Sequence, residues 1–380
     1  MPNRAKIRYA CGLPAPPARV LYPLLKGLDP VPVNTKRVFY VKFLAHSVFA
    51  EILGQRPDVR LDRLENETAD EIAAPVLAAA HVYQVGSTRG ELARRFHVDA
   101  SLIERAPDLL IVSTNGAGYD TVDVKACTDA GVLVVNQAGG NREAVAEHAL
   151  GMLLALSKRI VETNHAMRRV HPIERIAFIG NDVFGKTIGI IGLGHVGSRI
   201  AELCRGLFAM RALAYDPYLT AAECEGRHAV KVTLDELLRQ SDYVSVNCPL
   251  TAETRGMLGA AQFALMRNSA YFIITARGHI HDEAALAAAL QSRSIAGAGL
   301  DVWATEPPPR DHPLLQFDNV LVSPHTAGVT RETRHNMGKI AAAQVLDALD
   351  GRPVNRIVNP DVWSVYAGRF ERLFGFAPQA

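Results

Sequence analysis

The chain contains 380 residues, of which 48% are hydrophobic and 21% charged. This length predicts two or three domains and excludes a small disulfide scaffold, and the composition excludes an intrinsically disordered chain. The 41 Lys and Arg residues outnumber the 39 Asp and Glu residues by only 2, which leaves no excess positive charge for nucleic acid or an anionic membrane. Apolar stretches such as residues 149–156 are far shorter than the roughly 18 residues that span a bilayer. We therefore expect small-molecule chemistry, with neither nucleic acid nor membrane as a partner.

The sequence has five cysteines, Cys11, Cys127, Cys204, Cys224 and Cys248. None forms a CxxC pair or a Cys/His cluster at metal-ligand spacing, so no metal site is predicted. Reduced thiols are typical of the cytoplasm, where we expect this protein.

Residues 1–36 read as a Pro-rich extension. Residues 1–37 hold seven basic residues and one acid, a bias that leaves a transit peptide open. The seven prolines of the same stretch disfavour the amphipathic helix of such peptides.

A strand–helix alternation begins at Arg37, and residues 46–53 read as its first helix. Short runs rich in Val, Ile and Leu predict buried parallel strands. These runs are 37–43, 58–64, 78–85, 109–120 and 132–140. Residues 142–167 lack proline and carry apolar residues at helical spacing, which predicts one long helix that connects two domains.

A second alternation follows Gly185. Its predicted strands lie within residues 186–194, 212–216, 243–249, 271–278 and 296–303, and its predicted helices are 196–207, 234–240 and 282–291. About six parallel strands with intervening helices predict a doubly wound α/β domain. Residues 331–349 predict a further helix, and the tail after it is expected to fold back on the first domain.

The strand predicted at 187–191 is followed directly by a GxGxxG motif formed by Gly192, Gly194 and Gly197. Such glycines permit a tight turn, the approach of a pyrophosphate and close packing of the next helix, whose N-terminus stabilises the anion. Asp216 closes the next strand 19 residues after Gly197. A carboxylate there accepts hydrogen bonds from a ribose 2′-OH and repels a 2′-phosphate, so the motif predicts NAD rather than NADP.

Three ionisable residues, Arg277, Glu306 and His325, lie at or just beyond the carboxyl ends of predicted strands, where an open α/β sheet binds its ligand. Oxidation of a 2-hydroxy acid by NAD needs a carboxylate clamp, a base for the hydroxyl proton and a group that tunes this base. Arginine offers a planar fork for a carboxylate, histidine titrates near neutral pH, and a carboxylate stabilises imidazolium.

Several further motifs accompany these residues. They are GAGYD (116–120), VAEHAL (145–150), GLGHVG (192–197), YDP (215–217), PLTAET (249–254), TARG (275–278), GLDV (299–302), EPP (306–308) and PHTAG (324–328). Over roughly residues 37–355 the chain resembles the D-isomer-specific 2-hydroxyacid dehydrogenase family, which includes phosphoglycerate dehydrogenases and hydroxypyruvate/glyoxylate reductases.

The resemblance implies a role for each matching residue. Arg277 would bind the substrate carboxylate and carbonyl oxygen, His325 would be the general acid/base, and Glu306 would stabilise its protonated imidazole. Backbone amides would bind the substrate carboxylate at Gly116, Ala117 and Gly118. NAD would be bound by Gly192, Gly194, His195, Val196, Gly197, Asp216, Pro217, Cys248, Pro249, Thr254, Thr275, Ala276, Asp301, Ala327 and Gly328.

The resemblance also implies the organisation of the molecule. A Rossmann NAD-binding domain would span 142–330, and a flavodoxin-like substrate domain would combine 37–141 with 331–380. The expected protein is a homodimeric NAD-dependent D-2-hydroxyacid dehydrogenase acting on a small 2-keto or 2-hydroxy acid. Val85 replaces an Arg that is common in phosphoglycerate dehydrogenases, which favours glyoxylate or hydroxypyruvate over a phosphorylated acid. Arg89 is the residue that would overturn this preference if it reached a substrate phosphate instead. An NAD(H)-sensing corepressor-like binding protein on the same fold is the alternative.

Overall fold

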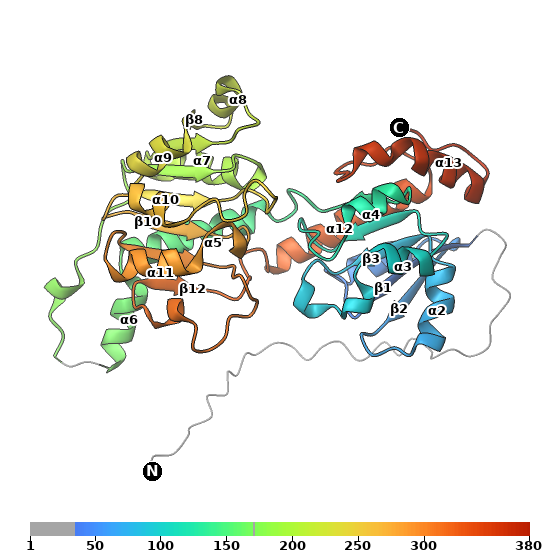
Figure 1. Cartoon of the computed structure of the whole chain (residues 1–380), viewed down its shortest axis with the longest axis horizontal. Coiled ribbons are helices and arrows are strands. Elements are labelled where there is room, and N and C mark those ends of the chain that lie inside the picture. Colours follow the sequence, from blue (N-terminus) through green and yellow to red (C-terminus); the bar gives the residue numbers. More distant parts are fainter. Residues whose placement is uncertain (1–34, 170–171) are drawn as a thin grey trace, which may run out of the picture. The chain divides into compact units, whose positions relative to one another are not determined.

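The computed structural model describes residues 35–169 and 172–380, so all but the last two residues of the predicted extension 1–36 lie outside the described part of the chain. The described chain holds two parallel sheets (Figure 1), both within the unit Lys36–Ala380.

The first sheet has the strand order β2-β1-β3-β4-β5, and every neighbouring pair is parallel. Its strands are β1 (Lys36–Val41), β2 (Val59–Leu64), β3 (Val82–Val85), β4 (Ile111–Thr114) and β5 (Leu133–Val135). All residues of β3, β4 and β5 are buried, because helices cover both faces of the sheet. This is the flavodoxin-like order, as predicted.

Two groups of helices cover this sheet. The helices of one face are α2 (Asp70–Ala78), α3 (Ala100–Arg105) and α4 (Val124–Asp129), and those of the other are α1 (Val48–Leu53), α12 (Arg331–Leu349) and α13 (Trp363–Phe374). The last two come from the far end of the sequence, so the chain returns to its first sheet (orange and red in Figure 1). The tail therefore folds back as predicted.

The second sheet has the order β12-β11-β10-β9-β6-β7-β8, again with parallel neighbours. Its strands are β6 (Thr187–Ile191), β7 (Arg211–Tyr215), β8 (Val230–Lys231), β9 (Tyr243–Val246), β10 (Tyr271–Ile274), β11 (Gly297–Leu300) and β12 (Val320–Val322). The chain order reverses between β6 and β9, which is the topological switch point of a Rossmann sheet.

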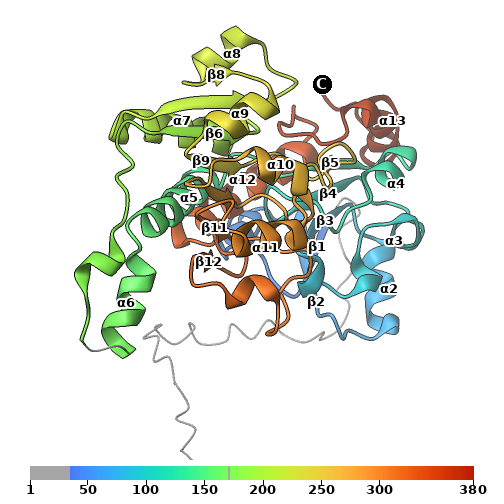
Figure 2. The same cartoon turned by 60° about the vertical axis from the view of Figure 1, so that its left-hand side comes forward.

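Helices cover both faces of the second sheet as well (Figure 2). One face carries α5 (Arg142–Ser157), α7 (His195–Phe208) and α8 (Ala221–Gly226), and the other carries α9 (Leu234–Gln240), α10 (Ala260–Leu265) and α11 (Glu283–Gln291). Short 3-10 helices occur at Arg89–Glu91, Arg94–Phe96, Arg175–Phe178, Gly278–Ile280, Pro313–Gln316 and Pro360–Val362.

The prediction of one long helix over 142–167 is wrong. Helix α5 ends at Ser157, and α6 (Ile160–Arg169) begins after Arg159, whose φ of 52° lies in the left-handed region. The Arg159 side chain donates to Glu162 and to the carbonyl of Ala177, and these contacts stabilise the turn. No described residue of α6 is buried, which distinguishes it from the core helix α5.

Candidate functional site

The carboxyl edge of the second sheet brings together the glycine loop after β6 and the loop after β9. Gly192 has a φ of +87°, and a Cβ there would lie 2.6 Å from the backbone nitrogen of Cys248. A Cβ at Gly197 would overlap the carbonyl oxygen of Gly192. Gly194 caps α7 without a side-chain hydrogen bond among the described residues, so the helix N-terminus is available to an anion such as a pyrophosphate.

Asp216 lies beside this loop, as the sequence predicts. Its carboxylate accepts hydrogen bonds from the backbone N–H of Leu193 (3.0 Å) and of Tyr218 (3.1 Å). Arg227, which sequence reasoning did not single out, donates from Nη1 to the Leu193 carbonyl at 2.8 Å. Both backbone polar groups of Leu193 are therefore held by side chains, and the Asp216 carboxylate lies directly beside the glycine loop.

His195 is exposed at the start of α7, and its ring lies against Gly139, where a Cβ would be 3.3 Å from the ring Nδ1. It therefore contacts the segment between β5 and α5. The neighbouring Val196 packs against the core beneath α7, and Pro217 is exposed after β7.

The loop after β9 has a defined shape. Thr254 donates to the Pro249 carbonyl at 2.7 Å and accepts from the N–H of Thr251 at 2.8 Å. Asn247 Oδ1 is buried and has no hydrogen-bond partner among the described residues. Cys248 lies against Gly192, so the loop after β9 is directly beside the glycine loop at the switch point of the sheet.

Thr275 follows β10 and supplies a second unpaired polar atom. Its residue is only 8% exposed, and its Oγ1 has no partner within the described chain. A buried hydroxyl without a partner is costly unless a ligand pairs with it. The amide of a nicotinamide ring fits this need, so the observed donors, glycine cradle and acid are all compatible with NAD.

The three predicted catalytic residues follow three adjacent parallel strands. Arg277 comes after β10, Glu306 after β11 and His325 after β12. Because the carboxyl ends of neighbouring parallel strands meet at one edge of the sheet, the topology brings the three loops together.

Nδ1 of His325 lies 2.8 Å from Oε2 of Glu306. The other carboxylate oxygen accepts from the Trp303 N–H at 3.1 Å. Burial raises the pKa of Glu306, but the hydrogen bond and charge of His325, the Trp303 N–H and the charge of Arg277 together hold this pKa below its usual value. The carboxylate is thus ionised, and it orients the ring so that Nε2 is available to a substrate.

Asp301 positions the loop that carries His325. Its fully buried carboxylate accepts from Ser323 Oγ (2.6 Å) and from the N–H groups of Thr326 (2.8 Å) and Ala327 (2.9 Å), and its carbonyl accepts from the His325 N–H (2.7 Å). His325 has a φ of 55°, a conformation that costs a non-glycine residue free energy and persists only where its surroundings enforce it.

Two contacts around this loop were not predicted. His148, which lies within the VAEHAL motif on α5, is 3.0 Å from Ser323 Oγ through its Nε2, and Trp303 Nε1 donates to the Ser323 carbonyl at 3.1 Å. Gly328, at the end of the loop, lies against Asn141, with a Cβ there 3.3 Å from Nδ2.

The predicted carboxylate-binding loop follows β4. The Gly116 carbonyl accepts from Thr114 Oγ1 (2.6 Å) and the Gln137 N–H (3.0 Å), and the Ala117 carbonyl accepts from Asn136 Nδ2 (2.9 Å). In a trans peptide the N–H points opposite to the carbonyl. The N–H groups of Ala117 and Gly118 therefore point away from the protein groups that hold these carbonyls.

Arg277 lies against this loop. A Cβ at Gly118 would overlap Nη2 of Arg277 and lie 3.0 Å from Oδ2 of Asp120. The guanidinium donates to Asp120 from Nη2 (3.0 Å) and Nε (3.2 Å), and to the Ala276 carbonyl from Nη1 (2.7 Å). Asp120 is thus part of the site, although the sequence indicated it only as the last residue of the GAGYD motif.

Val85, which stands where an arginine was expected for a phosphorylated substrate, is fully buried in the core of the first sheet. This position therefore offers no cation to a substrate phosphate.

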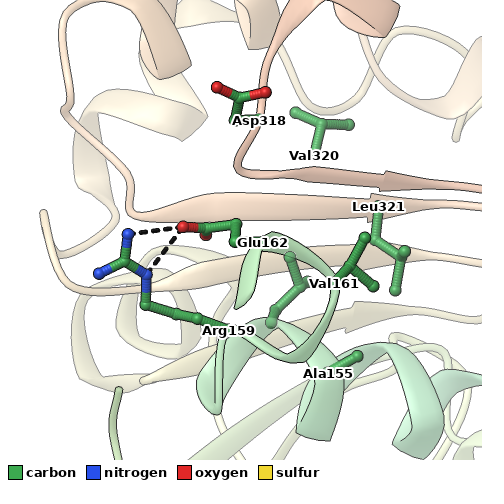
Figure 3. Close-up of a pocket in the computed structure, with 8 residues that line it drawn as sticks. Ala155, Arg159, Val161, Glu162, Asp318, Val320 and Leu321 are labelled. Atoms are coloured by element: carbon green, nitrogen blue, oxygen red, sulfur yellow. Dashed lines mark hydrogen bonds and ion pairs between the residues drawn. The ribbon is translucent and has the colours of Figure 1, made fainter. Parts of the chain in front are cut away.

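A small cavity lies apart from this site (Figure 3). It lies between the α5–α6 junction and the edge strand β12, next to the Arg159–Glu162 ion pair. Its volume is about 20 Å³, enough for one water molecule and too small for a substrate.

Within residues 35–169 and 172–380, no three His, Cys, Asp or Glu side chains are placed to hold a metal ion. In that same part of the chain, every helix is too short or too polar to cross a bilayer.

Residues 150–327 match the family model described as D-isomer specific 2-hydroxyacid dehydrogenase, NAD binding domain. A D-3-phosphoglycerate dehydrogenase of Archaeoglobus fulgidus is 41% identical over 279 residues, which are 73% of this chain but 52% of that protein. The chain thus spans about half the length of this relative. A glyoxylate/hydroxypyruvate reductase B of Salmonella gallinarum is 39% identical over 310 residues, which are 80% of this chain and 95% of that protein.

Among solved structures, a glyoxylate reductase from Paecilomyes thermophila superposes with a TM-score of 0.76 at 27% identity, covering 85% of this chain and 98% of that one. A D-lactate dehydrogenase from Aquifex aeolicus, complexed with NAD and lactic acid, gives a TM-score of 0.72 at 26% identity over 83% and 96% of the two chains. The chain therefore belongs to the D-isomer-specific 2-hydroxyacid dehydrogenase family. It is an NAD-dependent oxidoreductase of 2-hydroxy acids, and its predicted fold class is confirmed.

Proposed function

We propose that this protein reduces a small, unphosphorylated 2-keto acid, glyoxylate or hydroxypyruvate, to the D-2-hydroxy acid with NADH. The observation that carries the chemistry is the 2.8 Å pair of His325 and Glu306 at the same sheet edge as Arg277. The match to the Salmonella reductase covers 95% of that protein and 80% of this chain, and this supports the choice of substrate.

In this proposal Arg277 and the N–H groups of Ala117 and Gly118 bind the substrate carboxylate. Arginine supplies charge-assisted hydrogen bonds of fixed geometry, and the amides add donors that need no reorganisation. NADH, when bound, supplies a hydride to C2 of the keto acid. His325 delivers the proton from Nε2 to the oxygen on C2, and Glu306 stabilises the imidazolium before that transfer.

The remaining residues have supporting roles in the proposal. The glycine loop with Asp216 binds the dinucleotide, the Thr275 hydroxyl pairs with its carboxamide, and Asp301 fixes the loop of His325. We assign the segments 37–141 and 331–380 to the substrate domain and 142–330 to the NAD domain, since the helices of each segment pack on the corresponding sheet.

A kinetic panel tests the substrate. Initial rates of NADH oxidation with glyoxylate, hydroxypyruvate, pyruvate and phenylpyruvate are compared with NAD reduction by 3-phosphoglycerate. We expect the highest kcat/KM for glyoxylate or hydroxypyruvate, and a clear preference for 3-phosphoglycerate would contradict the assignment. His325→Ala should lower turnover about a hundredfold or more while NADH binding persists. NADH binding without turnover of any acid would instead favour the corepressor-like alternative.

We also infer that the protein is a cytoplasmic homodimer. Helix α6 and residues 172–179 project from the second sheet in both views (Figures 1 and 2). Large apolar side chains are exposed on these segments and at the start of the chain's return to the sheet, namely Ile160, Met167, Ile176, Ile179 and Phe184. So many exposed apolar side chains in one stretch of sequence support association with a second copy. Light scattering of wild type and Ile176→Glu tests this, because a dimer should dissociate in the variant and a monomeric wild type would contradict it.

A further inference from the structure

Asp120 forms an ion pair with Arg277 although the two residues are 157 positions apart in the sequence. The carboxylate lies along the Nε–Nη2 edge of the guanidinium: Oδ2 is 3.0 Å from Nη2 and 3.2 Å from Nε, and Oδ1 is 3.4 Å from Nε. Both side chains are partly exposed, at 27% for Arg277 and 34% for Asp120. A bidentate contact to a planar fork fixes the orientation of the fork as well as its position.

The contacts of Arg277 leave room for a second anion. A guanidinium has five N–H groups, and three of them are used by Asp120 and the Ala276 carbonyl. Among the described residues the other two, one on each terminal nitrogen, have no acceptor. Since Asp120 occupies the Nε–Nη2 edge of the guanidinium, the second N–H of Nη2 lies on the Nη1–Nη2 edge.

The position of Asp120 in the chain connects two parts of the site. It follows Gly118 by two residues, and Gly118 lies directly against Nη2 of Arg277. Asp120 therefore keeps the guanidinium of the second sheet beside the amide donors of the first.

We propose that Asp120 is a positioning residue for substrate binding: it holds Arg277 beside the N–H groups of Ala117 and Gly118, so that the guanidinium and the amides bind one substrate carboxylate together. This inference rests on the proposed role of Arg277. A long arginine side chain has many rotamers, and fixing one of them before the substrate arrives lowers the entropic cost of binding.

The test compares Asp120→Asn with a matched variant, Asp123→Asn, in the full-length protein. Asp123 caps α4 by accepting from the Ala126 N–H at 3.0 Å, and asparagine is an equally good cap. KM and kcat for hydroxypyruvate, the inhibition constant of oxalate and the dissociation constant of NADH are measured for both variants. We expect Asp120→Asn to raise KM and the oxalate constant about tenfold, with a smaller change in kcat and unchanged NADH binding. Asp123→Asn should match wild type.

A double variant, Asp120→Asn with Arg277→Lys, tests whether Asp120 acts through Arg277. A lysine cannot receive the bidentate contact, so Asp120→Asn should add little to the loss already caused by Arg277→Lys. Additive losses, or a KM for Asp120→Asn that is unchanged or lower than wild type, would overturn the positioning role. A wild-type KM in Arg277→Lys alone would instead refute the proposed function of Arg277, so the two failures are distinguishable.

Discussion

His325 and Glu306 form one hydrogen-bonded pair, with Nδ1 of the ring 2.8 Å from Oε2 of the carboxylate. The pair joins the loops after β11 and β12. The second carboxylate oxygen of Glu306 accepts a hydrogen bond from the Trp303 N–H, which fixes the orientation of the carboxylate. The depressed pKa of Glu306 shows that the pair favours the ionised carboxylate. The same hydrogen bond fixes the orientation of the His325 ring, with Nε2 on the side away from Glu306.

The first prediction concerns this pair. In Glu306→Gln a neutral amide replaces the charged partner of His325 Nδ1, so the positive charge on the ring that accompanies proton transfer is stabilised less. Turnover of the keto acid should therefore fall about tenfold or more, while the dissociation constant of NADH stays unchanged. A wild-type kcat in Glu306→Gln would count against the assigned role. Thermal melts of both proteins check that the fold is intact.

Cofactor choice provides the second prediction. The carboxylate of Asp216, held beside the glycine loop by two backbone N–H groups, would repel a 2′-phosphate. Wild type should have a higher kcat/KM with NADH than with NADPH, and Asp216→Ala should narrow the difference. Asp216→Asn, which keeps an acceptor for the backbone, should narrow it as well. Equal values for the two cofactors in wild type would refute this interpretation.

The third prediction uses the space around Gly118. A methyl group there would overlap the Arg277 guanidinium, so Gly118→Ala should raise KM for the keto acid about tenfold or more by displacing the clamp. Gly151→Ala is the matched control, because Gly151 lies on the exposed face of α5 with open space where a Cβ would be. Equal KM values for the two variants would contradict the placement of Arg277.

The fourth prediction concerns stability and pH. His281 is only 4% exposed, and neither ring nitrogen has a hydrogen-bond partner in the described chain. Burial lowers its pKa from 6.5 to about 4. Below pH 6.5 the unfolded chain therefore binds a proton at His281 that the folded protein does not bind. The free energy of unfolding falls by on the order of 1 kcal/mol per pH unit until about pH 4.

A variant isolates this contribution. In His281→Leu the protonation cost disappears, so the denaturant midpoint should decline less between pH 6.5 and pH 4.5 than in wild type. Parallel declines in the two proteins would show that other groups dominate the acid sensitivity.

Local patterns in the sequence predicted much of the fold. The bounds of β6 and of helices α9 and α12 match their predicted ranges, because apolar periodicity and capping residues act within a few positions. The break at Arg159 was missed, since apolar spacing continues through it and the contact that stabilises the turn reaches Ala177. A side chain that bonds a distant carbonyl leaves no local signal.

The candidate site, like the fold, was predictable from the sequence only in part. The glycine loop and the residues at strand ends are visible in the sequence because parallel topology places every such loop at one edge. Contacts between loops are not visible: Arg277 meets Asp120 at 157 positions and His148 meets Ser323 at 175.

The most direct test of the central claim follows the hydrogen atom itself. Hydroxypyruvate is reduced with NADH deuterated at C4 of the nicotinamide, and the product is analysed by NMR and by chiral chromatography. The account predicts D-glycerate with deuterium at C2 when the transferred face of the nicotinamide carries the label. Formation of L-glycerate, or a product without deuterium at C2 from NADH labelled on either face, would contradict it.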